Sequence, residues 1–259
     1  MSRAGEWEVE DSALRARRAS SFGAEAAAYD EHRPDYPVAG VHWALGPVDG
    51  KPDVEVLDLG AGTGKLTGVM LAAGLRVTAV EPDAAMRAVL MRRYPAVSTL
   101  AGSAESIPLQ DDSVDAVMAG QAFHWFDLPR AFPEIARVLR PAGVVAAFWN
   151  GHDTSVEWVA ELDRVSYTTA SFERRSTLGL PAHPLFYPFE RTEFAHSHRR
   201  TAESLTDTIG TNSHTLVVSP AERTAALERI AAYLSSRPET ATGEFDFPLR
   251  TLVIRALVK

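Results

Sequence analysis

The feature that most constrains this chain is Val-Leu-Asp-Leu-Gly-Ala-Gly-Thr-Gly-Lys at residues 56–65, where an apolar strand runs into glycines at alternate positions. Gly60, Gly62 and Gly64 lack a Cβ, so the backbone can take positive φ angles and approach a ligand closely. A helical pattern follows, and the free N–H groups of its first turn would point at that ligand. The segment therefore predicts a strand–turn–helix unit of an α/β fold with a ligand at the turn.

The spacing of the glycines indicates which type of ligand-binding motif this turn can be. A P-loop needs Gly, four residues and then Gly-Lys-Ser/Thr. Here Leu59 and Leu66 stand where the first glycine and the hydroxyl should be, which excludes a P-loop. A dinucleotide fingerprint has Gly-x-Gly-x-x-Gly, so Gly-x-Gly-x-Gly fits it only in part.

An acidic residue ends the next predicted strand. Residues 75–80 are apolar and β-branched, as in a buried parallel strand, and they stop at Glu81. A carboxylate in this place accepts hydrogen bonds from both hydroxyls of a ribose, so it predicts an adenosine-type ligand. An NAD-dependent oxidoreductase is one interpretation. Against this interpretation, the chain shows no Tyr-x-x-x-Lys pair for hydride transfer, since its lysines are Lys51, Lys65 and Lys259.

With Asp58 two residues before the first glycine, the turn resembles the first motif of the class I S-adenosylmethionine-dependent methyltransferases, Asp/Glu-x-Gly-x-Gly-x-Gly. Two later segments add to the resemblance. Residues 101–117 look like the family's adenine-binding turn and its lead into the fourth strand. Residues 139–145 look like its Leu-Lys/Arg-Pro-Gly-Gly turn, with Ala142 in place of the first glycine. Four motifs in the right order over residues 54–150 make the resemblance specific.

The resemblance implies S-adenosyl-L-methionine as cofactor and S-adenosyl-L-homocysteine as product. The residues expected around the cofactor come from the glycine turn, the acidic strand end, the adenine turn and the end of the fourth strand. They are Gly60, Ala61, Gly62, Thr63, Gly64, Glu81, Pro82, Met86, Ser103, Ala104, Glu105, Gln121 and Trp125.

Residues 22–37 have a resemblance of their own, Ala-x-x-Tyr-x-x-x-Arg-Pro-x-Tyr-Pro, to a small-molecule branch of the family similar to trans-aconitate methyltransferase. It implies that Tyr29 and Arg33 bind the methionine carboxylate, since a guanidinium pairs with a carboxylate through two hydrogen bonds. The alternative for Arg33 is a surface salt bridge. We expect residues 1–37 to cap the cofactor site and residues 38–259 to form a single methyltransferase domain.

The fourth predicted strand ends at residues 120–126, Gly-Gln-Ala-Phe-His-Trp-Phe, which should face the reactive end of the cofactor. His124 is the candidate catalytic base, because histidine takes a proton near neutral pH. Its alternative role is to hydrogen-bond the backbone or to stack beside the cofactor. A carboxylate acceptor would need cations instead of a base, and the arginines considered for it are Arg174, Arg175, Arg191 and Arg199.

Short apolar strands are expected near residues 54–59, 75–80, 97–101, 114–119 and 143–149, with helices near 64–73, 83–93 and 130–139. This alternation predicts an α/β fold with a doubly wound, seven-stranded, mainly parallel Rossmann-like sheet. The resemblance implies a C-terminal antiparallel pair, for which residues 191–198 and 244–258 are the expected strands. Helices are expected at 154–172 and 220–236. The aromatic-rich segment at about 154–190 is expected to be a helical lid over the acceptor.

The amino-acid composition excludes several classes of binding partner. The 34 acidic against 26 basic residues give a net charge of −8, which argues against a nucleic-acid or membrane-surface binder. There is no cysteine, and the histidines at 183, 196, 198 and 214 show no recognisable ligand spacing, so no metal is expected. No long apolar run or signal peptide is apparent, which predicts a cytoplasmic protein. The sequence gives no indication of oligomeric state.

The expected activity is methyl transfer by in-line displacement to a small organic acceptor, with O-methylation of a carboxylate or a hydroxyl favoured. The alternatives are the NAD-dependent oxidoreductase and a protein that binds S-adenosylmethionine without catalysis.

Overall fold

The computed structural model describes residues 34–170, 179–211 and 213–259. Seven strands form one sheet in the order β3-β2-β1-β4-β5-β7-β6. Neighbouring strands pair in parallel except at β7, which runs antiparallel to both β5 and β6. The doubly wound sheet and the C-terminal antiparallel pair predicted from the sequence are confirmed.

The strands are β1 (Glu55–Leu59), β2 (Arg76–Val80), β3 (Ser98–Leu100), β4 (Val114–Gly120), β5 (Leu139–His152), β6 (Glu190–Arg200) and β7 (Phe245–Leu257). The described α-helices are α3 (Val38–Leu45), α4 (Lys65–Ala72), α5 (Ala84–Arg93), α6 (Leu128–Val138), α7 (Glu157–Val165), α8 (Ala202–Gly210), α9 (Ser213–Leu216) and α10 (Pro220–Ser236). Two short 3-10 helices are η1 (Gly46–Val48) and η2 (Phe123–Trp125).

Helices cover both faces of the parallel part of the sheet. Helices α3 and α4 pack on one face through residues such as Met70, and α6 packs on the other through Phe132. Successive residues of β1 point to opposite faces, so Val56 joins the first layer and Leu57 the second. Because both faces are buried, these strands are nearly continuous apolar runs.

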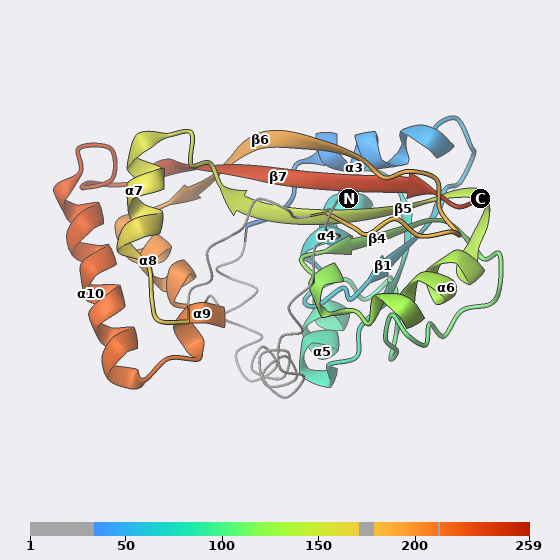
Figure 1. Cartoon of the computed structure of the whole chain (residues 1–259), viewed down its shortest axis with the longest axis horizontal. Helices are drawn as coiled ribbons and strands as arrows, with labels where there is room; N and C mark the ends of the chain where they lie inside the picture. The colour runs from blue at the N-terminus through green and yellow to red at the C-terminus, as the bar shows by residue number, and fades with distance from the viewer. Residues whose placement is uncertain (1–33, 171–178, 212) are drawn as a thin grey trace, which may run out of the picture.

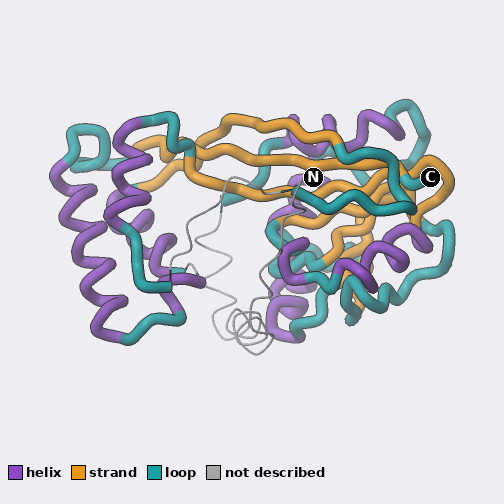
Figure 2. The backbone as a smooth tube through the Cα atoms, in the orientation of Figure 1, coloured by secondary structure: helices purple, strands orange, loops and turns teal. Residues whose placement is uncertain are grey.

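The long strands β5, β7 and β6 extend beyond the parallel part and end beside a group of helices, α7 to α10 (Figure 1). A separate hydrophobic core lies there, formed by α7, α8, α10 and the start of β7. Trp158, Leu205, Ile230 and Phe247 are among its buried side chains. Figure 2 shows this helical group at one end of the molecule and the C-terminus at the other.

The helix predicted at 154–172 is shorter in the structure, where α7 ends at Val165. Arg229 of α10 donates hydrogen bonds to the carbonyl oxygens of Val165 and Tyr167, and Glu222 accepts from the backbone N–H of Thr169. These tertiary contacts hold the chain in a turn where the sequence pattern alone would continue a helix. Helices α8 and α9, between predicted elements, were not expected.

The aromatic residues of the predicted lid lie in different places. Phe186 is buried in the main core with its ring centroid 5.5 Å from that of Phe132, and Phe189 packs 6.1 Å from Phe186. Trp158 belongs to the helical core, whereas Tyr167 borders the large cavity described below. Phe186 and Phe189 therefore pack in the core and do not line the cavity, while the lid at about 154–190 stays a prediction. Apolar packing against α6 holds them away from the cavity.

The turn at the start of β5 has an alanine at a position whose backbone conformation favours glycine. Ala142 has φ +60°, in the left-handed region that a Cβ disfavours. The pairing of β4 with β5 also shifts register between Val114 and Ala116. The turn expected at residues 139–145 is thus present as an irregular start of the strand.

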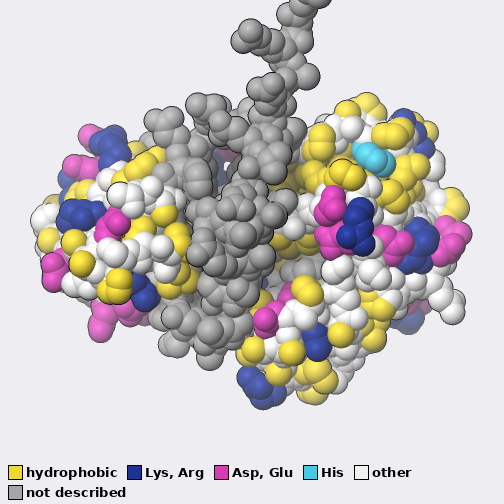
Figure 3. Space-filling view, turned by 60° about the horizontal axis from the view of Figure 1, so that its bottom comes forward, with side chains coloured by type: hydrophobic (Ala, Val, Ile, Leu, Met, Phe, Trp, Pro, Cys, Tyr) yellow, Lys and Arg dark blue, Asp and Glu magenta, His cyan; other side chains and the backbone are white. Residues whose placement is uncertain are grey.

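Charged side chains of both signs are interspersed over the described part of the surface in Figure 3, without a large basic patch on that face. In the described ranges, no helix combines the length and the apolar composition needed to cross a bilayer.

Candidate active site

A cavity of about 690 Å³ lies at the carboxyl ends of β1, β2 and β4. One half is made by the loops that follow β1 to β4. The other half is made by the far ends of β5, β6 and β7 together with α7 and α8. The position is the one at which open α/β sheets bind ligands.

Most residues expected around the cofactor line this cavity. They are Gly60, Ala61, Gly62, Thr63, Glu81, Pro82, Met86, Ser103, Ala104, Glu105, Gln121 and Trp125, and the candidate base His124 is with them. Gly64 is not in the lining. It is the N-cap of α4 with φ +90°, and a Cβ there would lie 3.0 Å from Leu90 and Tyr94, so the fold itself requires glycine at this position. Tyr29 and Arg33 lie outside the described residues.

The glycine turn takes the positive φ angles that the sequence suggested, and Gly60 also lies close to a neighbouring residue. Gly60 has φ +69°, and a Cβ at this position would lie 2.9 Å from the Cβ of Ala122. Gly62 has φ +57° but faces open space, with only the Met86 sulfur at 3.7 Å from a Cβ. A side chain at Gly62 would project toward the room that a ligand needs.

Glu81 is fixed at the end of β2 by backbone donors. Its Oε2 accepts from the N–H of Gly62 and its Oε1 from the N–H of Asp83, both at 2.8 Å. Burial raises the pKa of Glu81, and the two N–H donors oppose that rise. Each oxygen keeps a lone pair for a further donor, such as a ribose hydroxyl.

Two buried polar atoms beside the glycine turn have no hydrogen-bond partner among the described residues. Asp58 Oδ2 accepts from the Thr67 hydroxyl at 2.5 Å, whereas Asp58 Oδ1 has none. The Thr63 hydroxyl is also unpaired, and its residue is 1 % exposed. Burial raises the pKa of Asp58 to about 7. Buried polar groups are normally paired, so these two atoms are suited to pair with polar groups of a ligand at the glycine turn.

Asn150, near the end of β5, forms hydrogen bonds with residues of three separate segments. Its Nδ2 donates to the carbonyl oxygen of Asp35 at 3.2 Å, and its Oδ1 accepts from the Thr251 hydroxyl at 2.5 Å. Gln121 Nε2 donates to the Asn150 carbonyl oxygen at 2.9 Å. Gln121 lines the cavity as predicted, but this bond uses its amide nitrogen. No sequence motif marked Asn150, whose partners are distant in the chain.

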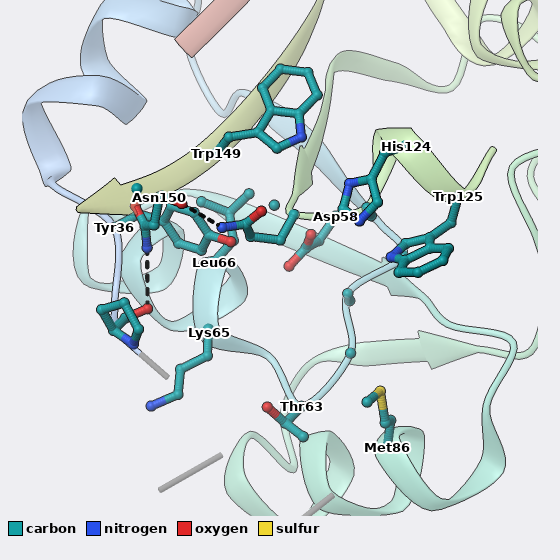
Figure 4. A pocket seen from close by; sticks show the side chains of 18 of the residues that line it. Tyr36, Asp58, Thr63, Lys65, Leu66, Met86, His124, Trp125, Trp149 and Asn150 are labelled. Atoms are coloured by element: carbon teal, nitrogen blue, oxygen red, sulfur yellow. Dashed lines mark hydrogen bonds between the residues drawn. The ribbon is translucent and has the colours of Figure 1, made fainter. Parts of the chain in front are cut away.

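Aromatic side chains border the cavity near the end of β4. Figure 4 shows His124, Trp125 and Trp149 along one side, with Thr63 and Met86 opposite and Asp58 between them. His124 is exposed, on η2, with its ring centroid 4.6 Å from that of Trp125. Trp149 is 6 % exposed, and its Nε1 finds no acceptor within the part of the chain that the structure describes.

The second half of the cavity is lined by residues 163, 166 and 167 of the predicted lid segment and by residues that the sequence did not single out for it. They are His152, Asp163, Ser166, Tyr167, His198, Arg200, Thr208, Phe247 and Leu249. Several elements far apart in the sequence supply them, so no local pattern could have grouped them.

The two histidines of β6 are two residues apart and so share one face of the strand. His196 hydrogen-bonds the Thr251 hydroxyl at 2.9 Å, and His198 lines the cavity. Burial and the charge of Arg200 lower the pKa of His198 to about 4. Among residues 34–170, 179–211 and 213–259, no three His, Cys, Asp or Glu side chains gather in a way that would hold a metal ion.

The arginines considered for a carboxylate acceptor do not line the cavity where the structure describes them. Arg191 and Arg199 are exposed on β6, and Arg199 pairs with Glu244 at 3.4 Å. Strand alternation places the neighbouring Arg200 at the cavity instead. Arg174 and Arg175 lie outside the described residues.

The strand order, the glycine turn and the acidic end of β2 together define a methyltransferase of class I. A family model described as a methyltransferase domain matches residues 57–147. An uncharacterized methyltransferase of Mycobacterium tuberculosis (strain ATCC 25618 / H37Rv), Rv3342, is 40% identical over 239 residues, which cover 91% of this chain and 95% of that protein. The chain belongs to the class I S-adenosylmethionine-dependent methyltransferases.

Two further similarities are informative. The structure of a putative type II methyltransferase from Anaeromyxobacter dehalogenans matches with a TM-score of 0.64 and 30% identity, over 86% of this chain and 97% of that one. A malonyl-[acyl-carrier protein] O-methyltransferase of Methylococcus capsulatus (strain ATCC 33009 / NCIMB 11132 / Bath) is 36% identical over 172 residues, 60% of each chain. The protein is thus a methyltransferase, and the oxidoreductase interpretation is set aside.

Proposed function

We propose that this protein transfers the methyl group of S-adenosylmethionine to an oxygen atom of a small organic acceptor. The observation that carries the proposal is one cavity that joins the glycine turn and Glu81 to a second, separately built half. The sulfonium charge already activates the methyl group. The protein has to align the acceptor with it and exclude water.

The residues present fit this cofactor. Glu81, Ser103 and Ala104 all line the cavity. Glu81 would accept from the ribose hydroxyls, and Ser103 and Ala104 would border the adenine. The Oδ1 of Asp58 and the hydroxyl of Thr63, which have no partner among the described residues, would be satisfied by the ammonium and carboxylate of the methionine part. Arg33, with Tyr29, remains the predicted carboxylate partner.

Several observations support a small acceptor and an oxygen atom as its reacting group. The second half of the cavity is lined by aromatic and hydrogen-bonding side chains such as Tyr167, Phe247 and Trp149. The net charge of −8 and the mixed charges in Figure 3 do not favour nucleic acid. The partial similarity to an O-methyltransferase favours oxygen over nitrogen or carbon.

The test begins with calorimetric titration of S-adenosylhomocysteine, with NADH as the paired control ligand. Binding of S-adenosylhomocysteine alone supports the proposal, whereas binding of NADH alone, or of neither, refutes it. Acceptor-dependent formation of S-adenosylhomocysteine from S-adenosylmethionine then distinguishes an enzyme from a protein that only binds the cofactor.

A further inference from the structure

A histidine–aspartate pair lies in the acceptor half of the cavity. His152 is the last residue of β5, and Asp163 is on α7. The Nδ1 of His152 and the Oδ1 of Asp163 are hydrogen-bonded, and both residues line the cavity. The mechanism sketched above uses neither residue.

The surroundings hold the imidazole of His152 in one orientation. Its ring meets the ring of Phe247 edge-on, with the centroids 4.9 Å apart and an angle of 70° between the ring planes. A carboxylate that accepts a hydrogen bond from Nδ1 selects the tautomer with the proton on Nδ1. The other nitrogen, Nε2, then carries a lone pair, and no hydrogen bond joins it to the described residues.

From this geometry we infer that His152, oriented by Asp163, is the general base, and that the acceptor is a hydroxyl compound rather than a carboxylate. An ionised carboxylate has no proton to give up, so a base opposite it would have no task. A phenol or an alcohol must lose a proton as its oxygen is methylated. This inference rests on the proposed function and narrows its acceptor class.

The step balances within the cavity. The O–H bond of the acceptor breaks and its proton goes to His152 Nε2. The oxygen lone pair forms the new bond to the methyl carbon, and the electron pair of the broken carbon–sulfur bond stays on sulfur. Asp163 stabilises the resulting imidazolium, which returns its proton to solvent.

Other titratable or charged side chains lie in the same region as His152 and Asp163. Tyr167, His198 and Arg200 line the same half of the cavity. Arg250 of β7 pairs with Asp153 at 2.9 Å, directly after β5. Any pH profile has to be compared with that of a His152 variant to separate these groups from the base.

The first experiment measures the tautomer of His152 by long-range ¹H–¹⁵N correlation on protein labelled at histidine nitrogen, with assignment by His152→Gln. The expected signal at pH 8 is that of a ring protonated at Nδ1. Asp163→Asn should shift it toward the Nε2 tautomer, because the amide can donate to Nδ1. Asp207→Asn, an exposed carboxylate on α8, is the matched control. An Nε2 tautomer in the wild type, or no response to Asp163→Asn, overturns the inference.

The second experiment adds 4-methylphenol, 4-methylbenzyl alcohol or 4-methylbenzoate to the protein saturated with S-adenosylhomocysteine. A hydroxyl probe should shift the His152 Nε2 resonance. A response to the carboxylate alone, or to none of the probes, overturns the inference. With S-adenosylmethionine and the hydroxyl probe that responds, His152→Gln should slow product formation about 100-fold. His42→Gln on α3 should not, and His124→Ala tests the competing base.

These outcomes separate the two proposals. If S-adenosylhomocysteine does not bind the wild type, the proposed function fails. If it binds but the tautomer or probe results are contrary, only the role of His152 and Asp163 fails. An unchanged calorimetric affinity of His152→Gln for S-adenosylhomocysteine shows that a loss of rate does not come from misfolding.

Discussion

Asp58 Oδ1, which no residue in the described part of the chain pairs with, gives a quantitative prediction for cofactor binding. Asp58 is fully buried in the ligand-free protein, and burial raises its pKa to about 7. If its Oδ1 receives the ammonium group of the methionine part, only the ionised form binds well. Between pH 8 and pH 6 the ionised fraction falls from about nine tenths to about one tenth, so the affinity should fall about tenfold, or ~1.4 kcal/mol.

The perturbation is Asp58→Asn, which keeps the shape and an acceptor for Thr67 but removes the charge. At pH 8 the variant should bind S-adenosylhomocysteine roughly 10- to 100-fold more weakly, since a hydrogen bond to a charged group contributes about 1.5–3 kcal/mol. At pH 6 the wild type has lost about tenfold in affinity, so the difference between the two proteins should shrink to about 1- to 10-fold. The variant should show little pH dependence in this interval.

The assay is calorimetric titration at pH 6, 7 and 8, with adenosine as the matched ligand. Adenosine has the ribose that Glu81 would bind but lacks the amino-acid part, so its affinity reports any titration of Glu81, whose pKa is also raised. A wild-type affinity for S-adenosylhomocysteine that is flat over this range refutes the reasoning. An equal pH dependence for adenosine, or for Asp58→Asn with S-adenosylhomocysteine, also refutes it.

The remaining predictions concern stability and are measured by urea unfolding of the ligand-free protein. Gly62→Ala should cost about 1–2 kcal/mol for the left-handed backbone alone, and Gly60→Ala more, because its Cβ would also meet Ala122 at 2.9 Å; equal costs would contradict this. Ala142→Gly should stabilise by about 1 kcal/mol, since it relieves a φ of +60°, and a loss of stability would show that the turn is not strained. Phe186→Ala should destabilise by about 3–5 kcal/mol, as for a core aromatic, without weakening S-adenosylhomocysteine binding; a small cost would restore it as a candidate lid residue.

Local signals in the sequence were sufficient for much of the fold. The apolar runs of β1, β2 and β4 stand out because both faces of these strands are buried. Ser219 before Pro220 marks the start of α10, whose bounds match the prediction, and the Ser219 hydroxyl accepts from the backbone N–H of Glu222. At α8 the N-terminal capping box is Thr201 with Ser204, where the usual pattern has Glu or Gln, so this helix was missed.

The sequence by itself determined the cofactor half of the site, because each of its parts is local. A glycine turn and an acidic strand end are set within a few residues of the chain, and parallel strands bring their carboxyl ends to one edge of the sheet. Gly60, Gly62 and Glu81 could therefore be assigned to one ligand site without coordinates.

Only the tertiary structure decided the acceptor half. The register of β5 on β7 sets His152 opposite Leu249 and Asn150 opposite Thr251, about a hundred residues away along the chain. The packing of α7 on α10 then brings Asp163 to His152. Such placements depend on long-range pairing and apolar contacts, which leave no pattern in any short segment, so the residues proposed here to choose the acceptor became visible only in the folded chain.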